Sequence, residues 1–169
     1  MASDRELSEL ARQVGQGLKA AGWRLVLAES CTGGWVGKLV TDVAGSSAWF
    51  ERGLITYSNE AKQQLLGVTA AALRESGAVS AEVAKAMAKG ALAASAADLA
   101  LAVTGIAGPE GGSADKPVGL VWFALAVKNG ASETSRRQFD GDRDAVRRQA
   151  VQTGLNLILA ATRTAIGGS

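Results

Sequence analysis

Two nucleophiles lie side by side in the stretch Ala28 to Gly34, which reads Ala-Glu-Ser-Cys-Thr-Gly-Gly. The stretch separates an apolar run from an amphipathic run, so we expect a strand that turns directly into a helix. The hydroxyl of Ser30 and the thiol of Cys31 are both candidates for acyl transfer. The start of the expected helix can hold the negative charge that develops on an attacked carbonyl oxygen.

The start of that helix is itself a candidate binding site. Its first amides lack intrahelical partners and carry the positive end of the helix dipole, which favours an oxyanion, carboxylate or phosphate beside Thr32, Gly33 and Gly34. The structural alternative is a Ser or Thr N-cap followed by glycines that allow close packing. This stretch alone does not decide between the two.

The composition limits the chemistry. The 169 residues are 47% hydrophobic and 20% charged, as expected for a single globular domain over residues 1–169. Histidine is absent, which excludes Ser-His-Asp sites and imidazole-ligated zinc, and we expect neither a metal nor a cofactor. Acid-base work then depends on Lys, Tyr, Glu, Asp or water. Without a histidine to take its proton, Cys31 is the weaker candidate nucleophile.

Charge and hydropathy restrict the partners. Eighteen basic and sixteen acidic residues give a formal net charge of +2 without a run of like charge, which argues against nucleic acid. The N-terminus lacks a signal-peptide pattern and no apolar run approaches about 18 residues, so we expect a cytoplasmic protein with no membrane partner. The single cysteine agrees with a reducing compartment.

A second polar stretch, Tyr57 to Lys62, follows a β-branched and aromatic run that we expect to be a strand. Ser58 or Asn59 is the expected N-cap of a short helix that ends near Leu66-Gly67. Lys62 then lies in the first turn, where the helix dipole and a dry site would both lower the pKa of its amine. A neutral lysine can act as a general base, whereas the structural alternative is a solvated surface lysine.

A third polar stretch, Thr104 to Ser113, follows a short apolar strand and is dense in glycine. Gly105 and Gly108 belong to a loop whose backbone can fold sharply and approach a ligand, although a flexible surface loop is the structural alternative. The spacing fits neither a Walker A loop nor a dinucleotide fingerprint. Arg143 and Arg147, at i and i+4 in the last helix, can face one anion together or pair with surface carboxylates.

The remaining pattern predicts the elements that position these residues. We expect helices over about 4–21, 35–43, 59–66, 81–97 and 143–161, and strands over about 23–27, 49–57, 98–103, 118–127 and 132–139. With a hairpin at Asn129-Gly130, this order predicts a three-layer α/β/α sandwich whose mixed sheet is mostly parallel, with an antiparallel hairpin strand at its edge. The three polar stretches then meet in one crevice. We expect that crevice to contain Ser30, Tyr57, Lys62 and Thr104.

Five motifs, in order along nearly the whole chain, carry a resemblance to a known family. They are Ala28 to Gly34, Tyr57-Ser58-Asn59 with Lys62, Gly77 to Ser80, Thr104 to Pro109 with Gly111-Gly112 and Lys116 to Gly119, and Phe139-x-Gly141-x-Arg143. This arrangement is similar to a stand-alone form of the CinA C-terminal domain family, which contains the nicotinamide-nucleotide amidohydrolases.

The resemblance implies hydrolysis of nicotinamide mononucleotide to nicotinate mononucleotide and ammonia, in pyridine-nucleotide salvage. It also implies Ser30 as the nucleophile and Lys62 as its base, with Tyr57 and Thr104 as polar site positions. We expect Tyr57 to be the third catalytic residue, as a relay for the proton that Lys62 gives to the departing ammonia. For the substrate phosphate, Arg143 and the loop 105–112 are candidates. The alternatives are a non-catalytic module that binds a pyridine nucleotide and an amidase for a different small amide. We expect the small nucleotide as the partner and a homo-oligomer as the assembly.

Overall fold

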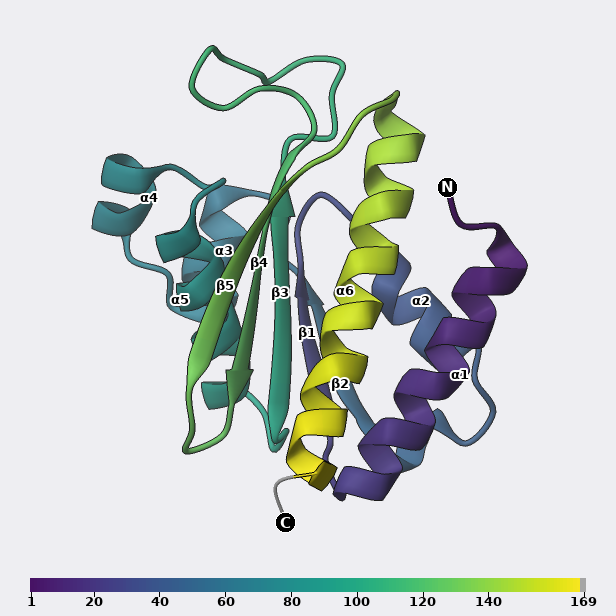
Figure 1. Cartoon of the computed structure of the whole chain (residues 1–169). Coiled ribbons are helices and arrows are strands. Elements are labelled where there is room, and N and C mark those ends of the chain that lie inside the picture. Colours follow the sequence, from purple (N-terminus) through teal and green to yellow (C-terminus); the bar gives the residue numbers. More distant parts are fainter. Residues whose placement is uncertain (168–169) are drawn as a thin grey trace.

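The structure, a computed structural model, describes residues 1–167 as a five-stranded sheet between two groups of helices (Figure 1). The helices are α1 (Asp4–Ala21), α2 (Trp35–Thr41), α3 (Asn59–Leu66), α4 (Ala70–Ser76), α5 (Ala81–Ala93) and α6 (Arg143–Gly167), with a 3-10 helix over Ser46–Ala48. The strands are β1 (Leu25–Glu29), β2 (Phe50–Ile55), β3 (Leu99–Gly105), β4 (Leu120–Val127) and β5 (Ser132–Gln138).

The sheet has the strand order β2-β1-β3-β4-β5, and the predicted mixed α/β sandwich is confirmed. Strands β2, β1 and β3 pair in parallel, whereas β4 is antiparallel to both of its neighbours, so four of the five strands run in one direction. The hairpin strand β5 lies at the edge of the sheet, as expected. The strand that runs against the other four is its partner β4, which lies inside the sheet. The loop after β3 folds back on itself, with the Gly119 amide donating to Ile106 O at 2.7 Å, so no crossover helix separates the two strands.

Most local signals act as predicted. Ser3 and Glu6 form a capping box at the start of α1, and Gly22 ends that helix in the left-handed conformation. The hairpin at Asn129-Gly130 is present, but its turn has three residues and not the two that an Asn-Gly pair favours, because Ala126 faces Ser132 and the Val127 amide donates to Ala131 O at 3.1 Å; Asn129 has a φ of 57°. Some details differ: β1 begins two residues later than expected, and α5 ends at Ala93 and not near residue 97. No prediction from the sequence covered α4, a seven-residue helix capped by Thr69.

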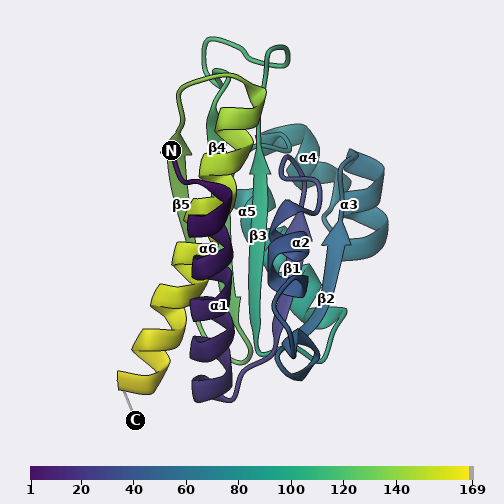
Figure 2. The same ribbon diagram turned by 90° about the vertical axis from the view of Figure 1, so that its right-hand side faces the viewer.

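The two faces of the sheet carry side chains of different size beneath their helices. Figures 1 and 2 show α1, α2 and α6 on one face and α3, α4 and α5 on the other. Side chains of β1 and β3 alternate between the two faces, with leucine and valine toward α1 and α6 and mainly alanine toward α5. These small side chains let the alanine-rich α5 pack closely on the sheet, and both central strands are buried on both faces.

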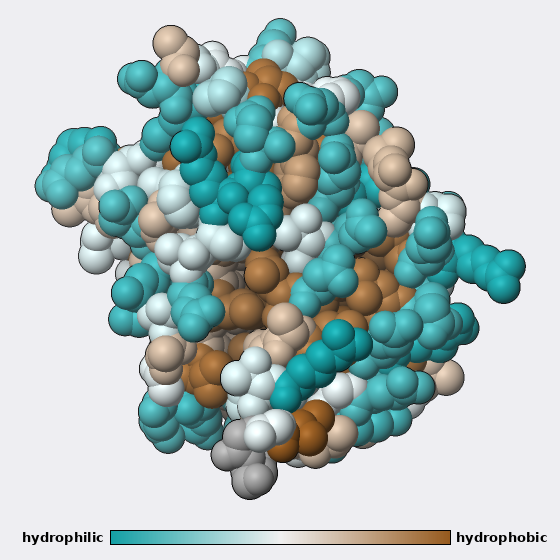
Figure 3. Space-filling view, in the orientation of Figure 1, coloured by the Kyte–Doolittle hydropathy of each residue, from teal (hydrophilic) through white to brown (hydrophobic). Residues whose placement is uncertain are grey.

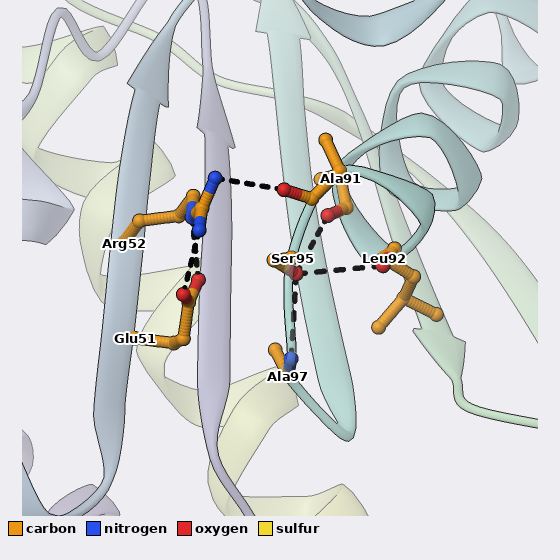
Figure 4. Close-up of polar contacts among 7 residues, drawn as sticks. Glu51, Arg52, Ala91, Leu92, Ser95 and Ala97 are labelled. Carbon is orange, nitrogen blue, oxygen red and sulfur yellow. Dashed lines mark hydrogen bonds and ion pairs between the residues drawn. The ribbon is translucent and has the colours of Figure 1, made fainter.

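At one end of the sheet, a hydrogen bond joins β2 to the end of α5. Where the parallel strands begin, Arg52 of the edge strand β2 pairs with Glu51 and donates to Ala94 O at 2.7 Å, just after α5 (Figure 4). The Ser95 hydroxyl donates to Ala91 O at 2.7 Å and so satisfies a carbonyl in the last turn of α5. The polar stretches singled out in the sequence lie at the opposite end.

The molecular surface carries an apolar groove beside α6, in the face shown in Figure 3. The groove has a volume of about 340 Å³, and its lining includes Trp23, Leu125, Val127, Leu157 and Ala161. Among residues 1–167, no helix combines the length and the hydropathy needed to cross a bilayer.

The contact between α3 and α5 generates a stability prediction. An added Cβ at Gly90 of α5 would lie 1.9 Å from the backbone oxygen of Leu66, so we expect Gly90→Ala to lower the free energy of unfolding by about 1–3 kcal/mol. Helix propensity alone would instead favour alanine by about 1 kcal/mol. Thermal denaturation measures the sign, with Gly167→Ala as the control because nothing lies within 4 Å of its added Cβ. An unchanged melting temperature in Gly90→Ala would contradict the close approach of the two helices.

Candidate active site

The turn Ser30 to Gly34, hereafter the serine turn, connects the end of β1 to the start of α2. The Ser30 amide donates to Val103 O at 2.9 Å, which ties the turn to β3, and the Gly33 amide closes the turn on Ser30 O at 3.0 Å. Gly33 and Gly34 have φ values of 59° and 92°, a region that favours glycine. The turn therefore holds Ser30 at the carboxyl end of a buried central strand.

The start of α2 is occupied by the side chain of Glu29, which is itself buried. Its carboxyl oxygens accept hydrogen bonds from Thr32 Oγ1 (2.7 Å) and from the amides of Gly34 (3.0 Å), Val36 (3.2 Å) and Gly37 (2.8 Å). An acidic side chain is favoured at this positive end of the helix. The anionic substrate expected beside Thr32, Gly33 and Gly34 does not fit these contacts, because the Glu29 carboxylate accepts from the Thr32 hydroxyl and the Gly34 amide.

None of the three residues expected at that anion site lines the cavity that contains Ser30. The amides of Gly33 and Gly34 are engaged within the protein, and Thr32 is fully buried. The signal that sequence reasoning missed is the glutamate directly before the serine, since an acidic residue beside a helix start is a common cap.

Lys62 is the buried partner of Ser30. Ser58 caps α3 by accepting from the Ala61 amide at 3.0 Å, and Lys62 follows in the first turn, with only 1% of its surface exposed. Its Nζ lies 3.0 Å from Ser30 Oγ, 2.8 Å from Thr56 O and 3.2 Å from Tyr57 O. The alternative of a solvated surface lysine is excluded. Loss of solvation on burial lowers the pKa of Lys62.

These contacts suit both protonation states of the Lys62 amine. A neutral amine has two N–H groups and one lone pair, and the carbonyls of Thr56 and Tyr57 can accept both N–H groups. The lone pair is then left for the hydroxyl proton of Ser30. Once protonated, the ammonium has three donors for the same three oxygens. A proton can therefore pass from Ser30 to Lys62 without any rearrangement of the lysine.

Tyr57 and Arg143 form the rim of the site. The Tyr57 side chain is 60% exposed, and its hydroxyl accepts from Arg143 Nη2 at 3.1 Å. Arg143 Nη1 also donates to Gly108 O at 2.8 Å, which joins the glycine-rich loop to the start of α6. Tyr57 contacts Lys62 through its backbone carbonyl and not through its hydroxyl, so a proton relay through that hydroxyl does not fit the geometry.

The polar stretches after β1, β2 and β3 meet in a cavity of about 230 Å³. The cavity is lined by Ser30, Cys31, Tyr57, Asn59, Lys62, Ala78, Val79, Thr104, Gly105, Ala107 and Arg143. The crevice expected from the parallel strands is thus present, with all four of its expected residues. Asn59 and Val79 also line it, although neither was singled out as a site residue.

The glycine-rich stretch contributes mainly through its backbone. The Thr104 hydroxyl donates to Ala78 O at 2.9 Å and so holds the segment before α5 against the cavity. An added Cβ at Gly105 would lie 2.6 Å from Val121 Cγ2, which accounts for glycine where β3 leaves the sheet. Gly108 does not line the cavity, and its carbonyl binds Arg143.

Cys31 is adjacent to Ser30 but differs from it in environment. It is buried, and loss of solvation raises the pKa of its thiol to about 12. A thiol with this pKa stays protonated near neutral pH, and the thiolate is the reactive form. Within residues 1–167, no three His, Cys, Asp or Glu side chains are grouped so as to hold a metal ion. Serine and lysine are therefore the reactive pair that the geometry offers.

The fold and this site define an α/β domain with a serine-lysine pair at the carboxyl edge of its parallel strands. The family model of the CinA C-terminal domain matches residues 7–162. The chain therefore belongs to the CinA C-terminal domain family.

Individual relatives agree with this family. The chain is 58% identical over 156 residues to a nicotinamide-nucleotide amidohydrolase PncC of Escherichia coli K12, covering 92% of this chain and 94% of that protein. It is 51% identical over 154 residues to the PncC of Pseudomonas putida, covering 90% and 95%. The crystal structure of a competence/damage inducible protein from Agrobacterium tumefaciens has a TM-score of 0.88 and 46% identity, covering 91% of this chain and 94% of that one.

Proposed function

We propose that this protein is an amidohydrolase that converts nicotinamide mononucleotide into nicotinate mononucleotide and ammonia. The observation that carries the proposal is the 3.0 Å contact between Ser30 Oγ and the buried Nζ of Lys62. Relatives of nearly equal length, at 58% and 51% identity, bear the name nicotinamide-nucleotide amidohydrolase. The pair supports attack on an amide, and the names of the relatives indicate which amide.

In the first half of the reaction, neutral Lys62 takes the hydroxyl proton of Ser30 as Oγ attacks the carboxamide carbon. The tetrahedral intermediate then collapses, and the Lys62 ammonium returns the proton to the departing nitrogen, which leaves as ammonia. The product of this half is an ester between Ser30 and the nicotinoyl group.

In the second half, Lys62 takes a proton from water as the water oxygen attacks the ester carbon. Collapse of this intermediate releases the nicotinate carboxyl group and returns the proton to Ser30 Oγ. The amide of Cys31 is the candidate donor to the oxyanion, because it directly follows the nucleophile and Cys31 lines the cavity. Within residues 1–167, this amide donates to no other residue.

The rim of the cavity suits the phosphate end of the substrate. A volume of about 230 Å³ is below the range of about 300–1,000 Å³ that encloses a whole drug-sized ligand. The nicotinamide ring therefore enters, and the ribose phosphate remains at the mouth. Arg143 lies there as a cation whose guanidinium retains free donors after binding Tyr57 and Gly108.

The proposed reaction belongs to pyridine-nucleotide salvage in the cytoplasm and uses no metal or cofactor. The homo-oligomer expected from the sequence stays a prediction. Light scattering tests it, since the mass of one chain is 17.2 kDa.

Ammonia release is the direct test of the proposal. We expect the purified protein to release ammonia from nicotinamide mononucleotide in preference to a panel of other small amides. Ser30→Ala should lower the rate by at least roughly 10³-fold, because the nucleophile is lost. Cys31→Ala is the matched control and should keep most of the activity. Tight binding of the nucleotide without ammonia release would favour a non-catalytic binding module, and equal losses in both variants would reassign the nucleophile.

The lowered pKa of Lys62 determines the expected pH dependence of the rate. Because the neutral amine is the base, the rate should rise with pH through an apparent pKa below the ordinary lysine value of about 10.4 and then level off. Lys62→Arg should be as inactive as Lys62→Ala, since a guanidinium keeps its proton near neutral pH. Initial rates between pH 5 and 10 measure the profile. An arginine variant with most of the activity would show that Lys62 is an electrostatic contact and not a base.

Arg143 is the residue that we expect to bind the phosphate of the substrate. If its guanidinium binds that group, Arg143→Ala should weaken the mononucleotide by about 1.5–3 kcal/mol and leave the riboside, which lacks phosphate, nearly unaffected. KM values for both substrates measure the difference, with Arg137→Ala as a control for the loss of one exposed positive charge. Equal use of the riboside and the nucleotide by the unmodified protein would contradict a phosphate site.

A further inference from the structure

Arg147, in the second turn of α6, binds the serine turn from the side of the helices. Its Nε donates to Cys31 O at 3.1 Å, and its Nη2 donates to Thr32 O at 3.1 Å. The guanidinium carbon lies 5.4 Å from the ring centroid of Trp35, and Nη2 lies 3.5 Å from the position of an added Cβ at Gly33. The planar group is thus held between an aromatic ring and the backbone of the turn.

The neighbouring Arg148 has different partners from Arg147. Arg148 also lies over Trp35, at 5.0 Å, but its guanidinium pairs with the carboxylates of Asp4 and Asp144. Within residues 1–167, Arg147 forms no such ion pair. From the sequence, we expect Arg147 to face an anion or to pair with a surface carboxylate. Its charge is instead directed at two carbonyl oxygens of the serine turn.

The direction of these carbonyls matters for chemistry at Ser30. Carbonyl oxygens carry partial negative charge, and one turned toward Ser30 would oppose the negative charge that builds on the attacked carbonyl. A planar peptide with its oxygen toward α6 presents its N–H to the opposite side. Gly33 and Gly34 give the turn the freedom to adopt other conformations. Glu29 accepts from amides that follow the turn, Arg147 donates to Cys31 O and Thr32 O, and Thr32 O also accepts from the Trp35 amide at 3.1 Å.

We infer that Arg147 is a positioning residue for the reaction at Ser30. By binding two consecutive carbonyls, it keeps the negative ends of their peptide dipoles away from the reacting centre and fixes the orientation of the nucleophile. Arg147 does not touch the substrate in this arrangement, since it does not line the cavity. The inference rests on the proposed amide hydrolysis.

A pair of methionine variants tests this role. Methionine keeps an unbranched side chain over Trp35 but cannot donate to a carbonyl. We expect Arg147→Met to lower kcat by about 10- to 100-fold with KM changed by less than about threefold, because the turn is misplaced while the binding cavity remains. Arg148→Met should keep the kcat of the unmodified protein. Guanidinium chloride, at a concentration that does not denature the protein, should restore part of the kcat of Arg147→Met.

The outcomes separate this inference from the proposed function. Equal kcat values in the two methionine variants, or a loss in Arg147→Met that lies entirely in KM, would overturn the positioning role. If circular dichroism shows that Arg147→Met does not fold, Arg147→Lys replaces it. Full activity in Arg147→Lys would then overturn the role of two hydrogen bonds to the carbonyls of Cys31 and Thr32.

A second readout does not depend on the substrate. Mass spectrometry measures the rate at which phenylmethanesulfonyl fluoride labels Ser30, which should be slower in Arg147→Met than in Arg148→Met. A protein that labels in this way but releases no ammonia would overturn the proposed function alone. Equal labelling rates would overturn the inference alone.

Discussion

The structure of the site depends on keeping the Lys62 amine out of water. An amine in solvent would be protonated near neutral pH and could not accept the proton of Ser30, so its burial is a condition for the proposed reaction. Burial of a lysine is costly unless its N–H groups are bound. The carbonyls of Thr56 and Tyr57 meet that need, and within residues 1–167 no acidic side chain forms an ion pair with Nζ. A carboxylate in that position would stabilise the ammonium and so disfavour the neutral amine that the proposed reaction needs.

The fold supplies this arrangement through three parallel strands and the turns that follow them. Strand β1 ends beside β2 and β3, so the serine turn, the peptide carbonyls after β2 and the threonine at the end of β3 reach one cavity. The segment that carries Thr56 and Tyr57 also leads into α3, whose first turn presents Lys62. The acidic side chain of Glu29 caps α2 and accepts from the amides of Gly34 and Gly37, which are therefore not left to a ligand.

Much of this could be predicted from the sequence because the signals are local. Capping residues, glycines and apolar periodicity identified most helices and all five strands, and the order of those elements predicted the α/β sandwich. The position of each polar stretch directly after a strand predicted that Ser30, Tyr57, Lys62 and Thr104 share a crevice. The absence of histidine limited the candidate bases to a few residue types, with lysine among them. These inferences need only residue types and their spacing.

Which group binds which partner depended on tertiary structure. The helix start at Thr32 to Gly34 had the pattern of an anion site, yet a glutamate of the same chain occupies it. Arg143 and Arg147 have the same side chain and face the same region, but one binds a tyrosine hydroxyl and a loop carbonyl, and the other binds the serine turn. A hydrogen bond requires two atoms within about 3.2 Å in a suitable direction. The periodicity of a sequence predicts which face of a helix or strand a side chain lies on. Only the packing of the elements against one another brings the donor and acceptor atoms of a hydrogen bond together.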